Sequence, residues 1–502
     1  MRREDRDRDI KIIGRISGEG LLINPDALQA LRSERNRNVL EEAIERSIRA
    51  AKEEGTKIIE ERHVRLSLSL VRSIGSMEIG ATKVVPLGKE YESNVELIYS
   101  PPSVSYVDDS VQSKTRHFRN RFEKLAAIIR RRPDFASAYT VREILRSPSP
   151  GPFKTIVMVA RKGRGNFIVE DLEEEMTLNI PKNAKKIVID SFHDLVTDIV
   201  VGIEVTRHRD ALFATDIILP QIPDTPVRKI REPISTLLLS DLHVGSKYFM
   251  EKDFLRVIEW LSKVEGGSSI SSVAASAKYL IIAGDVIDGV FVYPGQEREL
   301  DIVEVEKQYR RASQILAKIP EYIHVIVAPG NHDIVRKGLP QPPIPTEYLK
   351  ELADERGNVT LVGNPAVISL HGVRFVVYHG QSLEDVASYV AKVEYSKPQV
   401  GMEYLLSVRH LAPIYGDNTQ IALADNDDLV IGDKPDVFHA GHVHIFGKSE
   451  YRGTRIVNSG TWQQQTPYQN SLRIMPTPGT FAAYLMNDAR VLPLGLSDIE
   501  YA

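Results

Sequence analysis

The sequence has 502 residues, of which 26% are charged, with a net charge of −4 and no cysteine. This length suffices for two or three domains, and the lack of cysteine excludes disulfides and thiolate-ligated metals. The acidic balance gives no support to nucleic-acid binding, so any such binding must come from local basic patches or from a partner protein.

The first ten residues, MRREDRDRDI, are highly charged and lack the apolar core of a secretory signal. No apolar stretch approaches the length that spans a bilayer. We therefore expect a cytoplasmic protein with no membrane partner.

Residues 1–70 are predicted to form a small helical module. Asn24 is placed as an N-cap, with Pro25 at the first helical position. In the next helix, which is expected to end at Gly55, a stripe of small and apolar residues recurs at i, i+3 and i+4 spacing. The stripe consists of Leu40, Ala43, Ile44, Ser47, Ile48 and Ala51. It is interpreted as a local core, and docking of a partner is the alternative.

Residues 71–112 combine short strand-like runs with the turn signals SPPS and VDDS, and they are interpreted as a linker. A basic amphipathic helix follows, SKTRHFRNRFEKLAAIIRRRP. Its predicted buried stripe consists of Phe118, Phe122, Leu125, Ile128 and Ile129. The surrounding cations are Lys114, Arg116, Arg119, Arg121, Lys124, Arg130, Arg131 and Arg132. They form either a solvated face or a contact for nucleic-acid backbone or an acidic partner, and both interpretations stay open.

Together with this helix, residues 113–222 are predicted to form an OB-fold domain. The short runs FKTIVMVARKG, NFIVEDL, EEMTLNI, KKIVID, DIVVGIEVTR and DALFATDIILP are interpreted as strands of a compact barrel. The turn between the first two contains Arg161 and Arg164, which either touch phosphates or form an ordinary charged hairpin tip. A proline-rich linker over 223–235 then leads into a domain over 236–502.

Five apolar, strand-like runs in this last domain lead straight into short polar blocks. The blocks are SDLH, GDVID, GNHD, YHG and GHVH. A single DxH or GHxH is a weak signal, but ligand-binding residues of open α/β sheets gather at the carboxyl ends of buried strands. Five such ends together therefore predict one shared site.

The blocks offer carboxylate, amide and imidazole donors. These donors are Asp241, His243, Asp285, Asn331, His379, His442 and His444. They suit Mn²⁺, Mg²⁺, Fe or Zn²⁺ and are too many for one ion. Two ions about 3.5–4 Å apart clamp the attacking and leaving oxygens of a phosphoryl displacement. The pattern therefore predicts a two-metal phosphoesterase.

The order DxH, GDxxD, GNHD, H, GHxH resembles the calcineurin-like metallophosphoesterases, with every ligand position filled. The resemblance implies a β-sandwich flanked by helices and two metal positions bridged by Asp285. One position would also take Asp241, His243 and His444, and the other Asn331, His379 and His442.

The same resemblance implies that His332 stabilises or protonates the leaving oxygen and that Asp288 orients it by hydrogen bonding. For Asp333, a salt-bridged loop role is the alternative to a site role. The chain has GDVIDGV and GNHD where protein Ser/Thr phosphatases carry GDxxDRG and GNHE, and this departure argues against a protein phosphatase.

A helical module, an OB-like barrel and a phosphoesterase domain in this order resemble the small subunit of the archaeal family D DNA polymerase. The stretches GDVIDGVFVYPGQE and VNSGTWQQQTPYQNSLRIMPTPG also resemble that family, so the likeness covers nearly the whole chain. It implies a 3′→5′ proofreading exonuclease that uses two divalent ions, with Mn²⁺ favoured. The implied partners are a large catalytic polymerase subunit, DNA with a frayed or single-stranded 3′ end, and a sliding clamp.

Trp462 and Tyr468 are candidates for stacking on bases, and packing beneath the glutamine-rich loop is the alternative for both. Two rival functions also stay open. One is a free-standing nuclease or nucleotide phosphatase on the same fold, and the other is a scaffold subunit without catalysis.

Overall fold

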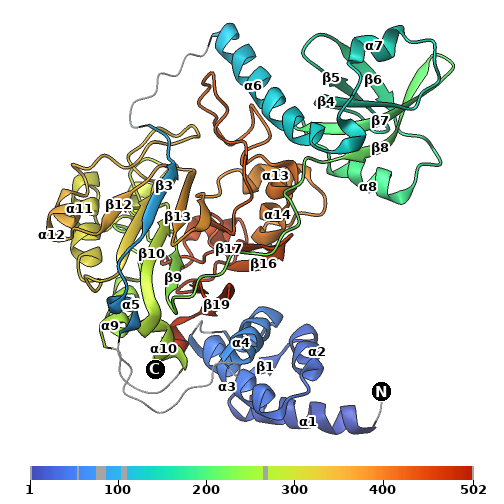
Figure 1. The fold of residues 1–502 in the computed structure, drawn as a ribbon. Helices are drawn as coiled ribbons and strands as arrows, with labels where there is room; N and C mark the ends of the chain where they lie inside the picture. The colour runs from blue at the N-terminus through green and yellow to red at the C-terminus, as the bar shows by residue number, and fades with distance from the viewer. Residues whose placement is uncertain (1–2, 54–55, 75–85, 103–109, 264–268, 500–502) are drawn as a thin grey trace.

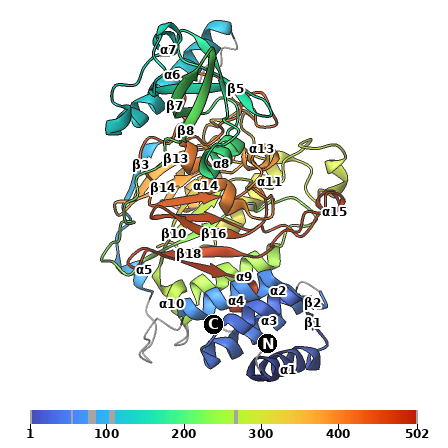
Figure 2. The same ribbon diagram turned by 90° about the vertical axis from the view of Figure 1, so that its right-hand side faces the viewer.

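The computed structural model describes residues 3–53, 56–74, 86–102, 110–263 and 269–499. A two-sheet sandwich forms the centre, and the N-terminal helices and a small barrel lie at opposite ends of it (Figures 1 and 2). Among the described residues, no helix has the length and apolarity needed to cross a bilayer.

The N-terminal module consists of four helices and one short parallel strand pair. The helices are α1 (Arg3–Gly18), α2 (Pro25–Ser33), α3 (Arg37–Glu53) and α4 (Glu61–Ile74), and the strands are β1 (Leu22–Ile23) and β2 (Ile58–Ile59). Asn24 caps α2 as predicted, because its side chain accepts a hydrogen bond from the Ala27 amide at 2.7 Å. The predicted stripe of α3 is buried in the core of the module. Gly55 lies outside the described residues.

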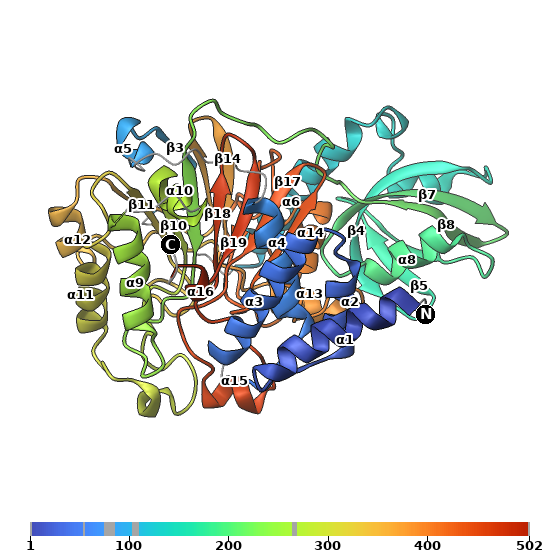
Figure 3. The same ribbon diagram turned by 90° about the horizontal axis from the view of Figure 1, so that it is seen from below.

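The module packs against the sandwich near the end of the chain. Figure 3 shows α3 and α4 beside β19 (Arg490–Leu494) and α16 (Leu496–Ile499). Arg46 of α3 forms an ion pair with Asp498 of α16, and both side chains are largely buried. The first and last parts of the chain therefore meet in space.

The interpretation of residues 71–112 as a linker is wrong in part. This stretch contains α5 (Leu87–Glu90) and β3 (Val95–Tyr99), and β3 pairs antiparallel with β13 (Ala366–Leu370) at the edge of a sheet. Since its pairing partner lies about 270 residues further along the chain, local sequence gave no indication of this strand's place.

A closed five-stranded barrel confirms the predicted OB-fold. Its strands are β4 (Phe153–Lys162), β5 (Asn166–Glu170), β6 (Glu175–Asn179), β7 (Val200–His208) and β8 (Ala211–Ile218), in the order β4-β5-β6-β8-β7. The run KKIVID is not a strand as predicted but opens helix α8 (Lys186–Asp194). Val188 and Phe192, four residues apart, bury the inner face of α8 against the barrel core.

The basic helix α6 (Val111–Arg130) precedes the barrel, followed by the 3₁₀ turn η1 (Pro133–Phe135) and α7 (Val141–Arg146). Phe122, Leu125 and Ile129 of α6 are buried as predicted. Arg121 is not part of a solvated face, because its side chain is fully buried. The barrel end of the molecule therefore has a charged group in its interior.

Two six-stranded sheets form the sandwich. One has the order β12-β11-β10-β9-β18-β19, and the other has the order β16-β17-β15-β14-β13-β3. The strands not yet given are β9 (Ser235–Leu239), β10 (Ala277–Ala283), β11 (His324–Ala328), β12 (Val359–Leu361), β14 (Val373–Val377), β15 (Val437–Ala440), β16 (Gly447–Tyr451), β17 (Thr454–Asn458) and β18 (Phe481–Leu485). The remaining elements are α9 (Glu251–Ser262), α10 (Ser269–Ser276), η2 (Gln296–Glu299), α11 (Val305–Leu316), α12 (Lys350–Glu355), α13 (Leu383–Tyr389), α14 (Pro398–Val408) and α15 (Pro467–Ser471).

The direction of five strands places the polar blocks at one rim. In the first sheet β9, β10 and β11 run parallel, and in the second β14 and β15 run parallel. Every residue of β9 and β10 is buried, as continuous apolar runs predict. The segments that follow these five strands carry the predicted donors. The domain boundaries inferred from the sequence stay predictions.

Candidate metal centre

The predicted donors fall into two clusters of buried and partly buried groups that share one rim. In the first cluster, Nε2 of His243 lies 2.9 Å from Nε2 of His444, and Nε2 of His444 lies 3.5 Å from Oδ1 of Asp241. These three residues follow β9 and β15, so both sheets contribute to the cluster. All three are buried.

The second cluster consists of the groups that follow β10, β11, β14 and β15. Nε2 of His379 lies 3.2 Å from Oδ2 of Asp285 and 2.9 Å from Oδ1 of Asn331. Nδ1 of His442 lies 3.0 Å from the same Asn331 oxygen. Asp285 also faces the first cluster, since its Oδ2 is 3.7 Å from Nε2 of His243. One carboxylate therefore stands between the two clusters.

These separations fit two divalent cations. Donors about 2.1 Å from a common ion are about 3.0–3.4 Å apart in octahedral or tetrahedral geometry. Two imidazole nitrogens at 2.9 Å, both directed at a pair of carboxylates, have the arrangement that such an ion organises. Three groups of described residues could each hold a metal: Asp241–His243–His444, Asp285–His379–His442, and His243–Asp288–His332, which shares His243 with the first.

The outer nitrogen of each imidazole is anchored, which fixes the inner nitrogen toward the centre. Nδ1 of His243 is 3.0 Å from Oδ1 of Asp288, and Nδ1 of His379 is 2.9 Å from the Ala283 carbonyl. The Gln469 carboxamide lies 2.7 Å from Nδ1 of His444. His442 differs, because its Nδ1 faces inward and its Nε2 is 3.4 Å from Glu384.

Five of the seven donors have backbone conformations in the left-handed region. The φ angles are 54° for Asp241, 53° for His243, 51° for Asp285, 71° for His442 and 59° for His444. This region is sparsely populated by residues with side chains, and such strain clusters at functional sites. The turns after the strands therefore hold these side chains inward at a conformational cost.

The charges in the centre are strongly coupled. Burial raises the pKa of Asp285, but the imidazoles of His379 and His332 outweigh that effect and hold the pKa well below its usual value. Burial likewise lowers the pKa of His379, yet the Asp285 and Asp241 carboxylates raise it to about 9. A cation that enters must therefore displace protons from this cluster.

His332 lies beside the seven predicted donors and belongs to the third group, with His243 and Asp288. Its Nδ1 is 2.7 Å from the backbone carbonyl of Asp288, and its Nε2 is 3.9 Å from Oδ2 of Asp285. Burial lowers the pKa of His332 to about 4. His332 therefore donates its hydrogen bond to the backbone carbonyl of Asp288, whereas the Asp288 carboxylate contacts His243.

Asp333 makes no salt bridge with any residue that the structure describes, so the salt-bridged alternative is wrong. Its carboxylate accepts hydrogen bonds from the Gly330 amide at 2.8 Å and from the Tyr309 hydroxyl at 2.9 Å. It is 2% exposed, and burial raises its pKa to about 6. Asp333 holds the loop that carries Asn331 and His332.

Three polar residues that support the centre were not singled out from the sequence. Gln463 donates from Nε2 to Oδ1 of Asp288 at 2.9 Å, while Gln469 and Glu384 contact His444 and His442. Thr466 and Gln469 form a capping box that starts α15. The T-x-x-Q pattern in TPYQ was the available signal, because it marks a helix start that fixes the Gln469 side chain.

The predicted DNA-contacting residues lie in different environments. Trp462 is 1% exposed and packs edge-on against Phe254 with ring centroids 4.8 Å apart, so the interpretation that it stacks on bases is wrong. Tyr468 is 50% exposed. Arg161 and Arg164 are exposed on the β4–β5 hairpin of the barrel.

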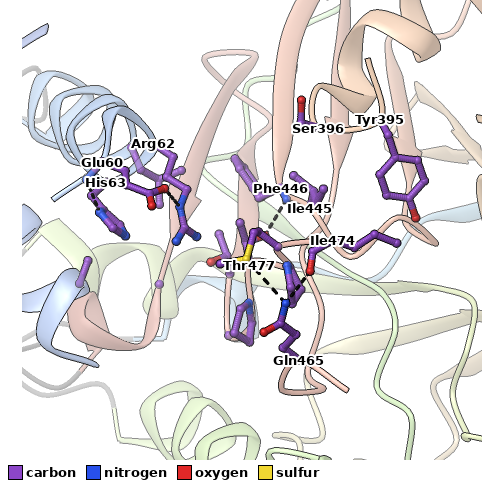
Figure 4. Close-up of a pocket in the computed structure, with 18 of the residues that line it drawn as sticks. Glu60, Arg62, His63, Tyr395, Ser396, Ile445, Phe446, Gln465, Ile474 and Thr477 are labelled. Carbon is purple, nitrogen blue, oxygen red and sulfur yellow. Dashed lines mark hydrogen bonds and ion pairs between the residues drawn. The ribbon is translucent and has the colours of Figure 1, made fainter. Parts of the chain in front are cut away.

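A cleft of about 1500 Å³ begins beside the centre and reaches the N-terminal module. Glu384, Ile445 and Gln464 line the end near the donors, and Arg62 and His63 line the opposite end. Figure 4 shows Arg62 and His63 on one side of this pocket and Tyr395 on the other, with Phe446 and Gln465 between them. Glu384 connects the cleft to the second cluster, because it lines the cleft and its Oε1 lies 3.4 Å from Nε2 of His442.

Comparison with known proteins gives consistent similarities. A family model that describes the B subunits of DNA polymerases alpha and epsilon matches residues 236–448. The DNA polymerase II small subunit of Pyrococcus horikoshii is 35% identical over 425 residues, which cover 82% of this chain and 68% of that protein. The DNA polymerase II small subunit of Methanothermobacter thermautotrophicus is 34% identical over 405 residues, which cover 80% of this chain and 83% of that protein.

Among solved structures, an archaeal phosphodiesterase aligns with 52% of this chain and 99% of its own, at 13% identity and a TM-score of 0.27. The sheet order and strand directions define the fold independently of this similarity.

Proposed function

The chain belongs to the family of archaeal DNA polymerase II small subunits, and from that membership we propose that its metal centre is the 3′→5′ exonuclease of a two-subunit DNA polymerase. In this proposal a large subunit extends the primer, and this chain removes mismatched nucleotides from the 3′ end. Asp241, His243, Asp285 and His444 hold one divalent cation, and Asp285, Asn331, His379 and His442 hold the other. Mn²⁺ is the favoured ion.

The observation that carries the proposal is the convergence of the six other donors around Asp285. Bound there, the cations would supply an acidified water nucleophile and charge neutralisation at the phosphate. The chain contributes the fixed geometry, because each imidazole is anchored through its outer nitrogen. A scaffold subunit without catalysis would have no need of this strained arrangement.

In this proposal His332 assists the departure of the sugar oxygen. Its Nδ1 is fixed on the Asp288 carbonyl at 2.7 Å, so Nε2 is the nitrogen that faces the centre. Its side chain is 14% exposed, whereas that of Asp285 is 2% exposed. The imidazole is therefore accessible to a substrate while remaining within the site. An approaching phosphodiester anion would favour the protonated form that donates from Nε2.

The depth of the centre favours a single-stranded end as substrate. The side chains of His379 and Asp241 are fully buried, and that of His243 is 2% exposed. A frayed 3′ end can bring its terminal phosphate closer to such buried groups than a rigid duplex can. This supports proofreading of unpaired termini over cleavage within duplex DNA.

The experiment is a digest of end-labelled primer–template with a mismatched 3′ end, with and without Mn²⁺. The full chain should shorten the mismatched primer one nucleotide at a time from its 3′ end, and only when Mn²⁺ is present. Asp285→Asn should abolish the shortening because it removes the shared charge between the two clusters. Asp354→Asn, which makes the same chemical change at an exposed position of α12, should retain it.

Two results would contradict the proposal. Preferential hydrolysis of nucleoside monophosphates would identify a phosphatase. Unchanged trimming by Asp285→Asn, after removal of any accompanying nuclease, would leave the centre without a role in the reaction. Asp285→Asn should still co-purify with the large subunit. This result would show that the variant has lost hydrolysis and not assembly.

A further inference from the structure

Two tyrosines from distant parts of the chain stack at the rim of the metal centre. The rings of Tyr293 and Tyr468 have centroids 5.2 Å apart and planes inclined by 18°. Tyr293 belongs to the segment that follows Asp288, and Tyr468 belongs to α15. Tyr468 is 50% exposed, so one ring of the pair is accessible from solvent.

The helix turn that carries Tyr468 is positioned by the residue next to it. The Gln469 carboxamide contacts Nδ1 of His444 at 2.7 Å. The same side chain accepts a hydrogen bond from the Thr466 amide, which closes the capping box of α15. The position of Tyr468 is therefore tied directly to a donor of the first cluster.

The Tyr293 ring is fixed in the same way from the other side. Its hydroxyl donates to Oε2 of Glu299 at 2.9 Å. Gln296, three residues further on, donates to the backbone carbonyl of Asp288 at 2.7 Å and to its Oδ2 at 3.0 Å. The two rings thus belong to segments that separately hold His444 and Asp288.

The exposure of Tyr468 is not explained by packing of the loop alone. An aromatic pair that only packed a loop would be expected to bury both rings, as Trp462 is buried beneath the same segment. Here the exposed ring of Tyr468 stacks on the ring of Tyr293. Both rings lie within a few residues of Gln469 and Asp288, which orient the donors. A flat, pre-oriented aromatic face beside a phosphodiester site suits a nucleobase, because every base has a π-face and stacking tolerates any sequence.

On the basis of the function proposed above, we propose that the Tyr293–Tyr468 pair is a stacking platform for a base at the 3′ end of single-stranded nucleic acid. The platform selects phosphodiesters that carry a base next to the scissile linkage. It acts without reading sequence, as removal of any mismatched nucleotide requires. The platform is a binding element, and the metal centre performs the hydrolysis.

The test compares two matched single-stranded oligonucleotides with the full chain in Mn²⁺. One has natural bases throughout, and the other has abasic residues at its 3′ end. Tyr468→Ala should lower kcat/KM for the natural oligonucleotide by about 5- to 150-fold, the range for loss of one stacked base. It should leave kcat/KM for the abasic oligonucleotide unchanged. Tyr468→Phe should behave like the unaltered chain on both.

Tyr139→Ala serves as the matched control, since Tyr139 is 47% exposed and contacts the barrel residue Phe153. It should alter neither rate. An equal loss by Tyr468→Ala on both oligonucleotides would show that the pair only supports the centre and would overturn the proposal. No loss on either oligonucleotide would overturn it as well.

A binding measurement separates failure of the platform from failure of the proposed nuclease. An oligonucleotide with 2-aminopurine at its 3′ end is added to Asp285→Asn, which is expected to lack hydrolysis. Stacking on Tyr468 should quench the fluorescence, and Asp285→Asn/Tyr468→Ala should lose the quenching. If the chain hydrolyses no oligonucleotide but this quenching difference is present, the platform stands and the nuclease proposal fails. If the two variants quench equally, the platform is wrong whatever the hydrolysis shows.

Discussion

Arg121 and Asp427 lie 306 residues apart and form a fully buried ion pair, with Nε of Arg121 2.7 Å from Oδ2 of Asp427. Arg121 belongs to α6 at the barrel, and Asp427 belongs to the loop before β15 of the sandwich. The same carboxylate oxygen lies 2.9 Å from Nε2 of His410 and 3.2 Å from Nε2 of His117. This cluster joins the barrel end of the molecule to the domain that carries the metal centre.

Arg121→Met should destabilise the protein by about 3–5 kcal/mol, because it leaves the Asp427 carboxylate buried without its cation. Chemical denaturation followed by tryptophan fluorescence gives the free energy of unfolding. Arg121→Met/Asp427→Asn should recover part of the loss, since the uncompensated charge is then gone. Arg116→Met on the same helix removes an exposed pair with Asp425 and should cost less than about 1 kcal/mol. Equal losses for the Arg121 and Arg116 variants would contradict the role of the buried pair.

His410 should make the stability depend on pH. Burial lowers its pKa to about 4 in the folded protein, against 6.5 as the ordinary value. The Ala412 amide donates to Nδ1 at 3.1 Å, so the folded state holds the neutral ring with its proton on Nε2 toward Asp427. Between pH 6.5 and 4 the unfolded chain binds the proton and the folded protein does not, so stability falls as the pH falls through this window.

The size of this effect is on the order of 3 kcal/mol for a shift from 6.5 to about 4. Melting temperatures at several pH values across this window measure it. His410→Gln keeps a donor toward Asp427 but does not titrate, so its melting temperature should fall less steeply over the same range. If the melting temperatures of the unaltered chain and His410→Gln fall in parallel with pH, His410 is not the group responsible.

Asp288→Asn should weaken Mn²⁺ binding by about 10- to 100-fold, the usual effect of losing a partner that orients a metal-ligating histidine. The Asp288 carboxylate lies 3.0 Å from Nδ1 of His243, and the amide of asparagine orients that ring without the negative charge. Titration calorimetry with Mn²⁺ gives the affinity without reference to activity. Asp253→Asn, on the partly exposed face of α9, is the matched control and should bind Mn²⁺ normally.

His332→Asn should lower the exonuclease rate by about 10²- to 10⁴-fold, the contribution typical of a positioned acid or base. Mn²⁺ content should be unchanged, because His332 lies outside the seven proposed donors. His379→Asn should instead lose bound metal, since Nε2 of His379 lies among the second cluster. Metal analysis beside the primer digest distinguishes the two. Loss of metal in His332→Asn would make His332 a ligand and not an acid.

The sequence determined which side chains form the site. A donor at the end of each of five apolar runs is a local pattern, and parallel strands bring their carboxyl ends to one rim. The N-cap at Asn24 and the barrel strands were readable for the same reason, because caps and alternation are set by near neighbours in the chain.

Tertiary structure alone decided how these pieces meet. β3 finds its partner in β13, Arg121 is buried because Asp427 arrives from 306 residues away, and Trp462 fills a core that Phe254 and Phe481 complete. Asp288 contacts His243 through its carboxylate and His332 through its backbone carbonyl. These two contacts likewise depend on three separate loops. Such contacts join residues that are distant in sequence. Their geometry is set by tertiary packing, which local secondary-structure propensity does not predict.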